Sequence, residues 1–154
     1  MPFQNEREFE DHIRKLITNY ILPLDTTLIL LDNKKTVDIM LCRNGNQPAI
    51  YFLEIKYYKK SHERLSTGHD KGGGFQPELL SKQPDYFKTN MRWILGNEDR
   101  EGFWLLTNEE LSQNLSGKEG IGKKYNNIKL AIFRTFNAFS ERELLALLKK
   151  WLNI

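Results

Sequence analysis

Two apolar segments of the chain carry charged residues of the kinds that bind metal ions. Asp38 lies in the segment Thr-Val-Asp-Ile-Met-Leu, and Glu54 and Lys56 lie in the segment Ile-Tyr-Phe-Leu-Glu-Ile-Lys-Tyr-Tyr. The turn-forming stretch Arg-Asn-Gly-Asn-Gln-Pro separates them, so we expect a hairpin. With the turn centred on Asn46, Asp38 lies opposite Glu54, and the two carboxylates are about 5 Å apart and repel each other.

This carboxylate pair predicts a metal-dependent catalytic site. Half-buried carboxylates that face each other are destabilising unless they share a proton or a cation. Lys56 follows Glu54 by two residues, and it therefore projects from the same face of the strand. A divalent cation between the carboxylates, with an ammonium group beside it, is an arrangement typical of catalysis.

A helix and three strands position these residues in the predicted fold. The helix is expected from Glu6 to Ile21, with Asn5 as its N-cap and Pro23 ending it. The strands that follow are joined by short polar turns, which favours an antiparallel meander. They are predicted over Thr27–Leu31, Thr36–Cys42 and Ala49–Tyr58.

The remaining segments complete a mixed sheet covered by helices. The chain is polar and lacks periodicity from Lys59 to Gln76, which indicates a loop that leaves the strand bearing Glu54. The order α-βββ-α-β-α-β-α predicts an α/β fold in a single domain, residues 1–154. The later elements are a helix over Asp85–Leu95, a strand over Gly102–Leu106, a helix opening at Thr107, a loop over Ser116–Asn127, a strand over Ile128–Phe136 and a helix from Ser140 to Trp151.

Composition narrows the class of protein. The 154 residues include 23 basic and 20 acidic side chains, and the net charge of +3 permits a polyanionic partner without requiring one. Cys42 is the only cysteine, which excludes a disulfide framework and a cysteine-based zinc site. No apolar run is long enough to span a membrane, and the N-terminus lacks the apolar core of a signal peptide. We therefore expect a soluble, cytoplasmic protein without a membrane partner.

Together these residues and elements resemble the PD-(D/E)XK nuclease superfamily. The shared features are a helix that carries a glutamate, an aspartate entering a strand, and a Glu-x-Lys on the next strand. The similarity covers Glu6 to Leu106 and implies a restriction-endonuclease-like αβββαβ core, in which helices flank a mixed central sheet. One position departs from the pattern, because Val37 stands where the family has a proline that takes no part in the chemistry.

The resemblance implies a role for each residue of the predicted site. Asp38 would be the main metal ligand, Glu54 the second, and the backbone carbonyl of Ile55 a third. Lys56 would orient or activate the attacking water and stabilise the charge that develops on the phosphorane. Mg²⁺ is the expected cofactor, with Mn²⁺ able to replace it, because hard carboxylate oxygens suit Mg²⁺ and a bound metal lowers the pKa of water.

Two further positions of the family pattern have more than one candidate in this chain. The helical glutamate is assigned to Glu10, at the edge of the apolar stripe, while Glu6 stays possible. For either glutamate, the alternative is a favourable charge in the first turns of a helix. The glutamine that follows Glu-x-Lys in many relatives is assigned to Gln83, just before a predicted helix, rather than to Gln76, which follows three glycines.

Aromatic and basic residues that follow the site are predicted to contact nucleic acid. Such side chains can bind phosphates and stack on unpaired bases, and a solvated charged loop is the plain alternative. The predicted contacts are Tyr58, Lys59, Lys60, Arg64, Lys71, Lys123 and Lys124.

The resemblance implies a Mg²⁺-dependent endonuclease that hydrolyses DNA phosphodiester bonds, of the sequence-specific restriction or homing type. Double-stranded DNA is the expected partner. A double-strand cleaver with one site per chain needs two subunits, so we expect a homodimer or a higher homo-oligomer. Holliday-junction-resolving, repair and RNA-directed nucleases would use the same chemistry and stay open. The alternative from another class is a catalytically idle nucleic-acid-binding domain that keeps the fold.

Overall fold

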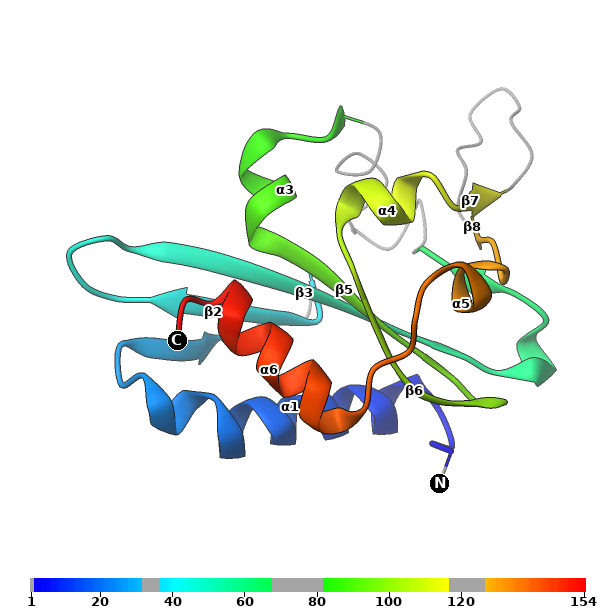
Figure 1. Ribbon diagram of the computed structural model, residues 1–154, viewed down its shortest axis with the longest axis horizontal. Coiled ribbons are helices and arrows are strands. Elements are labelled where there is room, and N and C mark those ends of the chain that lie inside the picture. The colour runs from blue at the N-terminus through cyan, green and yellow to red at the C-terminus, as the bar shows by residue number, and fades with distance from the viewer. Residues whose placement is uncertain (1, 32–36, 68–81, 117–126) are drawn as a thin grey trace.

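The computed structural model describes residues 2–31, 37–67, 82–116 and 127–154, and its centre is a five-stranded mixed sheet (Figure 1). The strands lie in the order β1-β2-β3-β5-β6, and β3 pairs parallel with β5 while the other neighbours are antiparallel. With helices on the sheet, this arrangement confirms the predicted α/β class. The strands are β1 Leu28–Leu31, β2 Ile39–Arg43, β3 Ala49–Tyr58, β5 Met91–Asn97 and β6 Arg100–Leu106.

Helices cover both faces of this sheet (Figure 1). On one face lie α1 (Glu6–Tyr20) and α6 (Glu141–Trp151). The other face carries α3 (Asp85–Asn90), α4 (Asn108–Ser112), α5 (Ile132–Thr135) and a small sheet of β4 (Leu65–Ser66), β8 (Asn127–Ile128) and β7 (Leu115–Ser116). Two 3₁₀ turns, η1 (Leu22–Leu24) and η2 (Lys60–His62), follow α1 and β3. In the part of the chain that the structure describes, no helix combines the length and the apolar character needed to cross a membrane.

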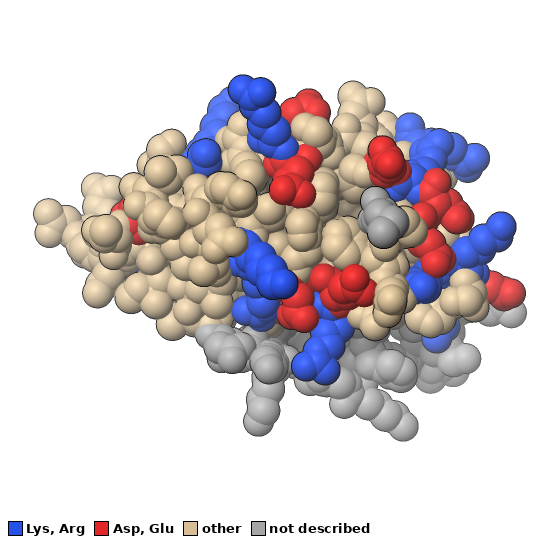
Figure 2. Space-filling view, turned by 90° about the horizontal axis from the view of Figure 1, so that it is seen from below, with Lys and Arg blue, Asp and Glu red and all other residues tan. Residues whose placement is uncertain are grey.

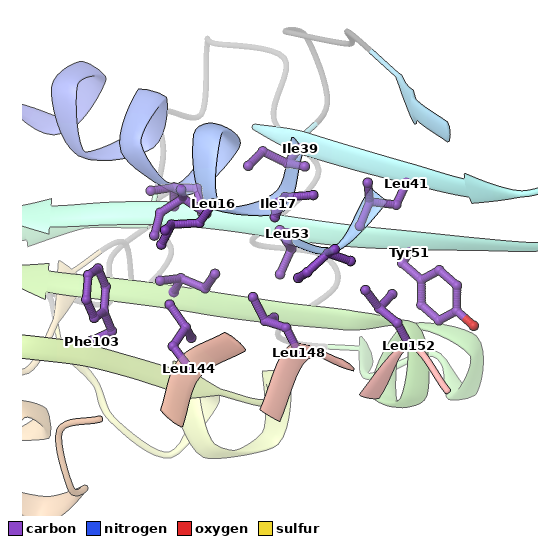
Figure 3. Packing of buried hydrophobic residues seen from close by; sticks show 14 of the residues in the cluster. Leu16, Ile17, Ile39, Leu41, Tyr51, Leu53, Phe103, Leu144, Leu148 and Leu152 are labelled. Atoms are coloured by element: carbon purple, nitrogen blue, oxygen red, sulfur yellow. The ribbon is translucent and has the colours of Figure 1, made fainter. Parts of the chain in front are cut away.

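Alternate residues of the strands face the core beneath α1 and α6 (Figure 3). In β3, Leu53 and Ile55 belong to this core, whereas Phe52 belongs to the core on the opposite face. Because side chains alternate along a strand, Glu54 and Lys56 project toward the same face as Phe52. Glu54 and Lys56 therefore leave β3 on the face opposite to the one that α1 covers.

Helix α1 has the N-cap, the end before a proline and the apolar stripe that the sequence predicts. Asn5 Oδ1 accepts a hydrogen bond from the backbone N–H of Glu8 at 2.8 Å, which caps the first turn. The helix ends at Tyr20, one residue earlier than predicted, and Pro23 follows within η1. Its apolar stripe packs on the sheet through Phe9, Ile13, Leu16 and Ile17.

The hairpin of β2 and β3 has the register expected from a turn centred on Asn46. Ile39 pairs with Leu53, and the same register places Asp38 opposite Glu54. Strand β2 begins at Ile39, immediately after Asp38, and so is shorter than predicted. Asp38 therefore lies at the entrance of the strand rather than inside it.

The predicted helix over Asp85–Leu95 is wrong in its second half. Helix α3 ends at Asn90, and Met91–Asn97 form β5, which pairs parallel with β3. Trp93 and Ile94 are both fully buried, because β5 is covered on its two faces. A short apolar run that is buried all round contains the same residue types as a buried helix, so apolar spacing alone misassigned it.

The predicted strand over Ile128–Phe136 is also wrong. Strand β8 ends at Ile128, and α5 follows after a turn. Ile132 and Phe133 are buried together with Ile128, whereas Leu130 is 37% exposed. Burial of the adjacent residues Ile132 and Phe133 does not fit a strand with one buried face, which would bury every second residue.

Two predicted helix starts are confirmed by their capping geometry. Thr107 and Ser140 each accept a hydrogen bond from the third residue of the helix, and the glutamate at that position bonds back to the cap. The strand that precedes Thr107 begins at Arg100, two residues earlier than predicted.

Candidate functional site

The candidate site forms along the edge of β3 that β2 leaves uncovered. Because β2 begins only at Ile39, the later residues of β3 need other hydrogen-bond partners on that side. Asp38 Oδ2 accepts a hydrogen bond from the backbone N–H of Ile55 at 2.7 Å. Glu6, from α1, accepts one from the backbone N–H of Tyr57 at 3.3 Å. Carboxylates from two separate elements thus occupy successive N–H groups along this edge.

Glu54 and Lys56 form an ion pair beside these two carboxylates. Lys56 Nζ lies 3.4 Å from Glu54 Oε1, and the two side chains expose only 13% and 4% of their area. Burial acts to lower the pKa of Lys56, but attraction to Glu54, Glu6 and Asp38 outweighs it and raises the pKa above its ordinary value. Lys56 is therefore a charged ammonium at neutral pH, held among three carboxylates.

A second cation, Arg14, connects α1 to Asp38. Its guanidinium lies 3.1 Å from Oε1 of Glu10 and also donates a hydrogen bond to the backbone carbonyl of Asp38. The pairing with Glu10 follows from the spacing of four residues on one helix, which is visible in the sequence. The contact with Asp38 spans 24 residues, and sequence reasoning missed it because it depends on how α1 lies against the sheet.

Negative charge exceeds positive charge in this cluster. Burial raises the pKa of Glu6, and the nearby Asp38 adds to that rise while Lys56 opposes it. Burial and then repulsion by Asp38 raise the pKa of Glu10, against the effect of Arg14. The predicted carboxylates, together with the alternative Glu6, thus gather around two basic side chains, which favours the binding of a further cation.

A surface hollow gives access to part of the cluster. Glu6, Glu10 and Asp38 are among the residues that line it. Figure 2 views the molecule from the side on which α1 lies, and acidic side chains gather there among basic ones. The rest of the lining is Arg7, Asp11, Arg14 and Leu30.

The oxygen donors suit a hard divalent cation that keeps part of its water. Among the described residues, no three His, Cys, Asp or Glu side chains are arranged to hold a metal, so a closed cage of side chains is absent from this part of the chain. Mg²⁺ commonly uses one or two carboxylates and retains several waters. The hydrogen bond from Ile55 engages one of the two oxygens of Asp38. The carbonyl of Ile55 points to the same edge as its N–H, which places it with Asp38 and Glu54 among the donors.

Gln83 precedes α3, and its side chain contacts the start of α4 rather than the carboxylate cluster. Its Nε2 donates to the backbone carbonyl of Asn108 at 3.4 Å, and the Asn108 side chain accepts from the indole of Trp93 at 2.7 Å. Trp93 is the register partner of Glu54 where β3 pairs with β5. Asn108 and Trp93 therefore connect Gln83 to the site. Gln76 lies outside the described residues.

The predicted nucleic-acid contacts fall in different environments. Lys59 Nζ is 3.1 Å from Glu98 Oε1, an ion pair that ties the end of β3 to the β5–β6 turn. The ring of Tyr58 packs near Phe133, with 6.2 Å between the ring centroids. Lys60 and Arg64 are exposed, and the positions outside the described residues are Lys71, Lys123 and Lys124.

Comparisons of this chain with protein-family models, with curated proteins and with solved structures found no match. The chemistry of the cluster around Asp38, Glu54 and Lys56 is therefore the basis for a functional proposal.

Proposed function

We propose that this protein is a Mg²⁺-dependent endonuclease with the restriction-endonuclease-like fold, and that it hydrolyses phosphodiester bonds in double-stranded DNA. The observation that supports the proposal is the clustering of Asp38, Glu54 and Lys56 at the uncovered edge of β3. A largely buried cluster with excess negative charge is destabilising unless a cation joins it. Among the described elements, and leaving aside the 3₁₀ turns and the two-residue strand β4, the order α1-β1-β2-β3-α3-β5 also agrees with an αβββαβ core.

The residues that would hold Mg²⁺, or Mn²⁺ in its place, are Asp38, Glu54 and the carbonyl of Ile55. Such an ion supplies a nucleophilic water at neutral pH and neutralises the phosphate. Hydrogen bonds fix Asp38 from two sides, through the N–H of Ile55 and through Arg14 on its backbone carbonyl. Outer hydrogen bonds of this kind orient a ligand and increase metal affinity.

In the proposed mechanism Lys56 acts as a cation and Glu6 as a base. The raised pKa of Lys56 keeps its ammonium protonated, so it donates hydrogen bonds to a phosphate oxygen and stabilises the charge of the transition state. Burial makes the carboxylate of Glu6 a stronger base than an exposed one, and it accepts the proton of the attacking water. The water oxygen forms a bond to phosphorus while the bond to the leaving oxygen breaks. Glu10 is paired with Arg14 and supports Asp38 indirectly.

Sequence-specific cleavage by a homodimer is the form of this activity that we favour. One chain carries one such cluster among its described residues, and cleavage of both DNA strands then requires two chains. Junction-resolving, repair and RNA-directed nucleases would use the same residues, so the substrate must be established by experiment.

A catalytically idle nucleic-acid-binding domain is the second candidate. One observation favours it, because Asp38 and Glu6 both accept hydrogen bonds from the backbone of β3 and so stabilise the strand edge without a metal. In that case the carboxylates serve the fold alone, and no divalent cation should be needed for binding.

Incubation of the purified protein with supercoiled plasmid in Mg²⁺, in Ca²⁺ and in EDTA tests the proposal. Discrete fragments that appear only with Mg²⁺ support a sequence-specific nuclease. If plasmid, junction, single-stranded and RNA substrates all stay intact, the nuclease is refuted and the idle domain is favoured.

Variants of the site residues test the assignment itself. Asp38→Asn and Lys56→Met should each abolish cleavage when assayed at a temperature at which circular dichroism shows the variant to be folded. Asp25→Asn is a matched control, because Asp25 is a partly buried carboxylate that lies 3.1 Å from Arg43 and takes no part in the cluster. Cleavage by Asp38→Asn at a rate near that of the Asp25→Asn control would refute the assigned site.

A further inference from the structure

The end of the molecule formed by the second half of α1, η1 and β1 almost lacks charge. Between Lys15 and Asp32 the only charged residue is Asp25, and its carboxylate is paired with Arg43. In Figure 2 this end lies on the left, where almost no acidic or basic surface is visible. Charged residues make up 28% of the whole chain, so an uncharged end of this size has to be explained.

Strand β1 is the outermost strand at this end, and its sequence does not protect it from pairing. Its residues are Leu-Ile-Leu-Leu, and within the described part of the chain it pairs only with β2. Edge strands are commonly protected by a lysine, a proline or a bulge, and β1 contains none of these. Ile29 and Leu31 expose 48% and 38% of their area on the face of the sheet away from α1.

Other exposed apolar side chains surround this strand. Tyr20 at the end of α1 and Leu24 in η1 are each more than half exposed. Ile50 lies in the same cross-strand row as Ile29, with Cys42 between them. Of the eight large apolar side chains that are exposed among the described residues, five lie around β1: Tyr20, Leu24, Ile29, Leu31 and Ile50.

We propose that this edge is the contact between two copies of the chain, in which β1 pairs antiparallel with β1 of the partner across a two-fold axis. The axis would be perpendicular to the sheet, so each face continues into the same face of the other copy. Ile29 and Leu31 of one copy then meet the same residues of the other. The four residues of β1 carry no charge that would repel a copy or select a partner of opposite charge. The two sheets would become one continuous sheet.

The exposed apolar area around β1 fits the central part of such a contact, not the whole of it. Ile50 lies two strands inward from β1, so it stays outside the contact. Tyr20, Leu24, Ile29 and Leu31 expose about half of their surface, on the order of 370 Å² together, compared with the ~800 Å² that each partner buries in a standard interface. Backbone pairing along β1 and the residues around it would contribute the rest. The proposal does not depend on nuclease activity, since it follows from β1 and its surroundings alone.

Sedimentation equilibrium in EDTA tests this contact directly. The wild-type protein should be a dimer. Ile29→Lys and Ile29→Glu each place like charges opposite or diagonal to one another across the axis, and each should raise the dimer dissociation constant at least tenfold. An equimolar mixture of the two variants should form a heterodimer again, because the charges are then opposite.

Two leucines of matched exposure provide the control. Leu31 and Leu130 are 38% and 37% exposed, and Leu130 lies between β8 and α5 rather than near β1. Leu31→Lys should dissociate the dimer, whereas Leu130→Lys should leave it unchanged. Ile29→Thr, which keeps a β-branched side chain, is a milder second variant if the lysine variant fails to fold by circular dichroism.

Three results would overturn the proposal: a wild-type protein that stays monomeric at all concentrations, equal dissociation by Leu31→Lys and Leu130→Lys, or a mixture of folded charge variants that does not pair. None of these measurements uses cleavage as its readout. The dimer contact and the nuclease activity can therefore fail independently.

Discussion

Replacement of Lys56 by methionine should destabilise the folded protein by about 3 to 5 kcal/mol, the usual loss when one partner of a buried ion pair is removed. The pair is buried, since Lys56 Nζ lies 3.4 Å from Glu54 Oε1 and the side chains are 13% and 4% exposed. Methionine keeps the packing of the apolar stem, so the loss reports mainly on the charge. Glu6 and Asp38 also attract Lys56, and they lose that attraction in the variant.

Two further variants separate the effect of charge from that of packing. Adding Glu54→Gln to Lys56→Met removes the unpaired charge, and it should recover about 1 to 3 kcal/mol of the loss. Lys59→Met is the matched control, because Lys59 also pairs with a glutamate, Glu98, at 3.1 Å. That pair is more exposed, at 20% and 29%, so its loss should stay below about 1 kcal/mol.

Urea unfolding followed by tryptophan fluorescence measures these differences, and Trp93 is a suitable reporter because it is fully buried and pairs with Glu54 across β3 and β5. Ca²⁺ should restore part of the stability of Lys56→Met. A ligand that binds only the folded state adds about 2.7 kcal/mol at 100 times its dissociation constant. The same Ca²⁺ should add little to Asp38→Asn. A loss below about 0.5 kcal/mol for Lys56→Met, as at an ordinary surface position, would refute the buried charge cluster.

Three other perturbations follow from the same geometry. The pKa of Glu6 is raised above 4.5 in the folded state, which therefore binds this proton more tightly than the unfolded state does. As the pH falls from the raised pKa toward 4.5, the free energy of unfolding of the wild type, measured in EDTA, should therefore rise relative to that of Glu6→Gln. A difference between the two proteins that does not change with pH would contradict the raised pKa. Arg14→Met removes the support of Asp38 and should weaken Ca²⁺ binding about tenfold by calorimetry with an unchanged circular dichroism spectrum, whereas unchanged affinity would exclude a positioning role. Gly96→Ala places a methyl group 2.7 Å from the ring of Phe9 and should lower stability by about 1 to 3 kcal/mol in urea, and an unchanged midpoint would contradict this close packing.

The hairpin and its charges could be predicted because local features determine them. The turn around Asn46 determines the register of two adjacent strands, and the alternation of side chains then places Asp38 opposite Glu54. The same alternation places Lys56 on the face of Glu54. Each of these inferences needs only residues that are close together in the sequence.

The rest of the site depends on contacts that are distant in the sequence. Glu6 reaches the N–H of Tyr57, 51 residues away, because the start of α1 lies over the end of β3. No periodicity within α1 distinguishes this position from Glu10. Apolar spacing predicts a helix where β5 forms, because a strand buried on both faces has no alternation to reveal it. The parallel pairing of β5 with β3 places Trp93 beside Glu54.

The hydrogen bonds made by Asp38 and Glu6 do not by themselves account for acids at these positions. The N–H groups of Ile55 and Tyr57 need acceptors where β2 is absent, because an unpaired buried backbone group is destabilising. The side-chain oxygen of asparagine or glutamine would accept the same hydrogen bonds without a charge. The acids instead add repulsion, since Asp38 raises the pKa of both Glu6 and Glu10. Capping of the strand edge therefore explains the oxygens, whereas the binding of a divalent cation would explain the charge.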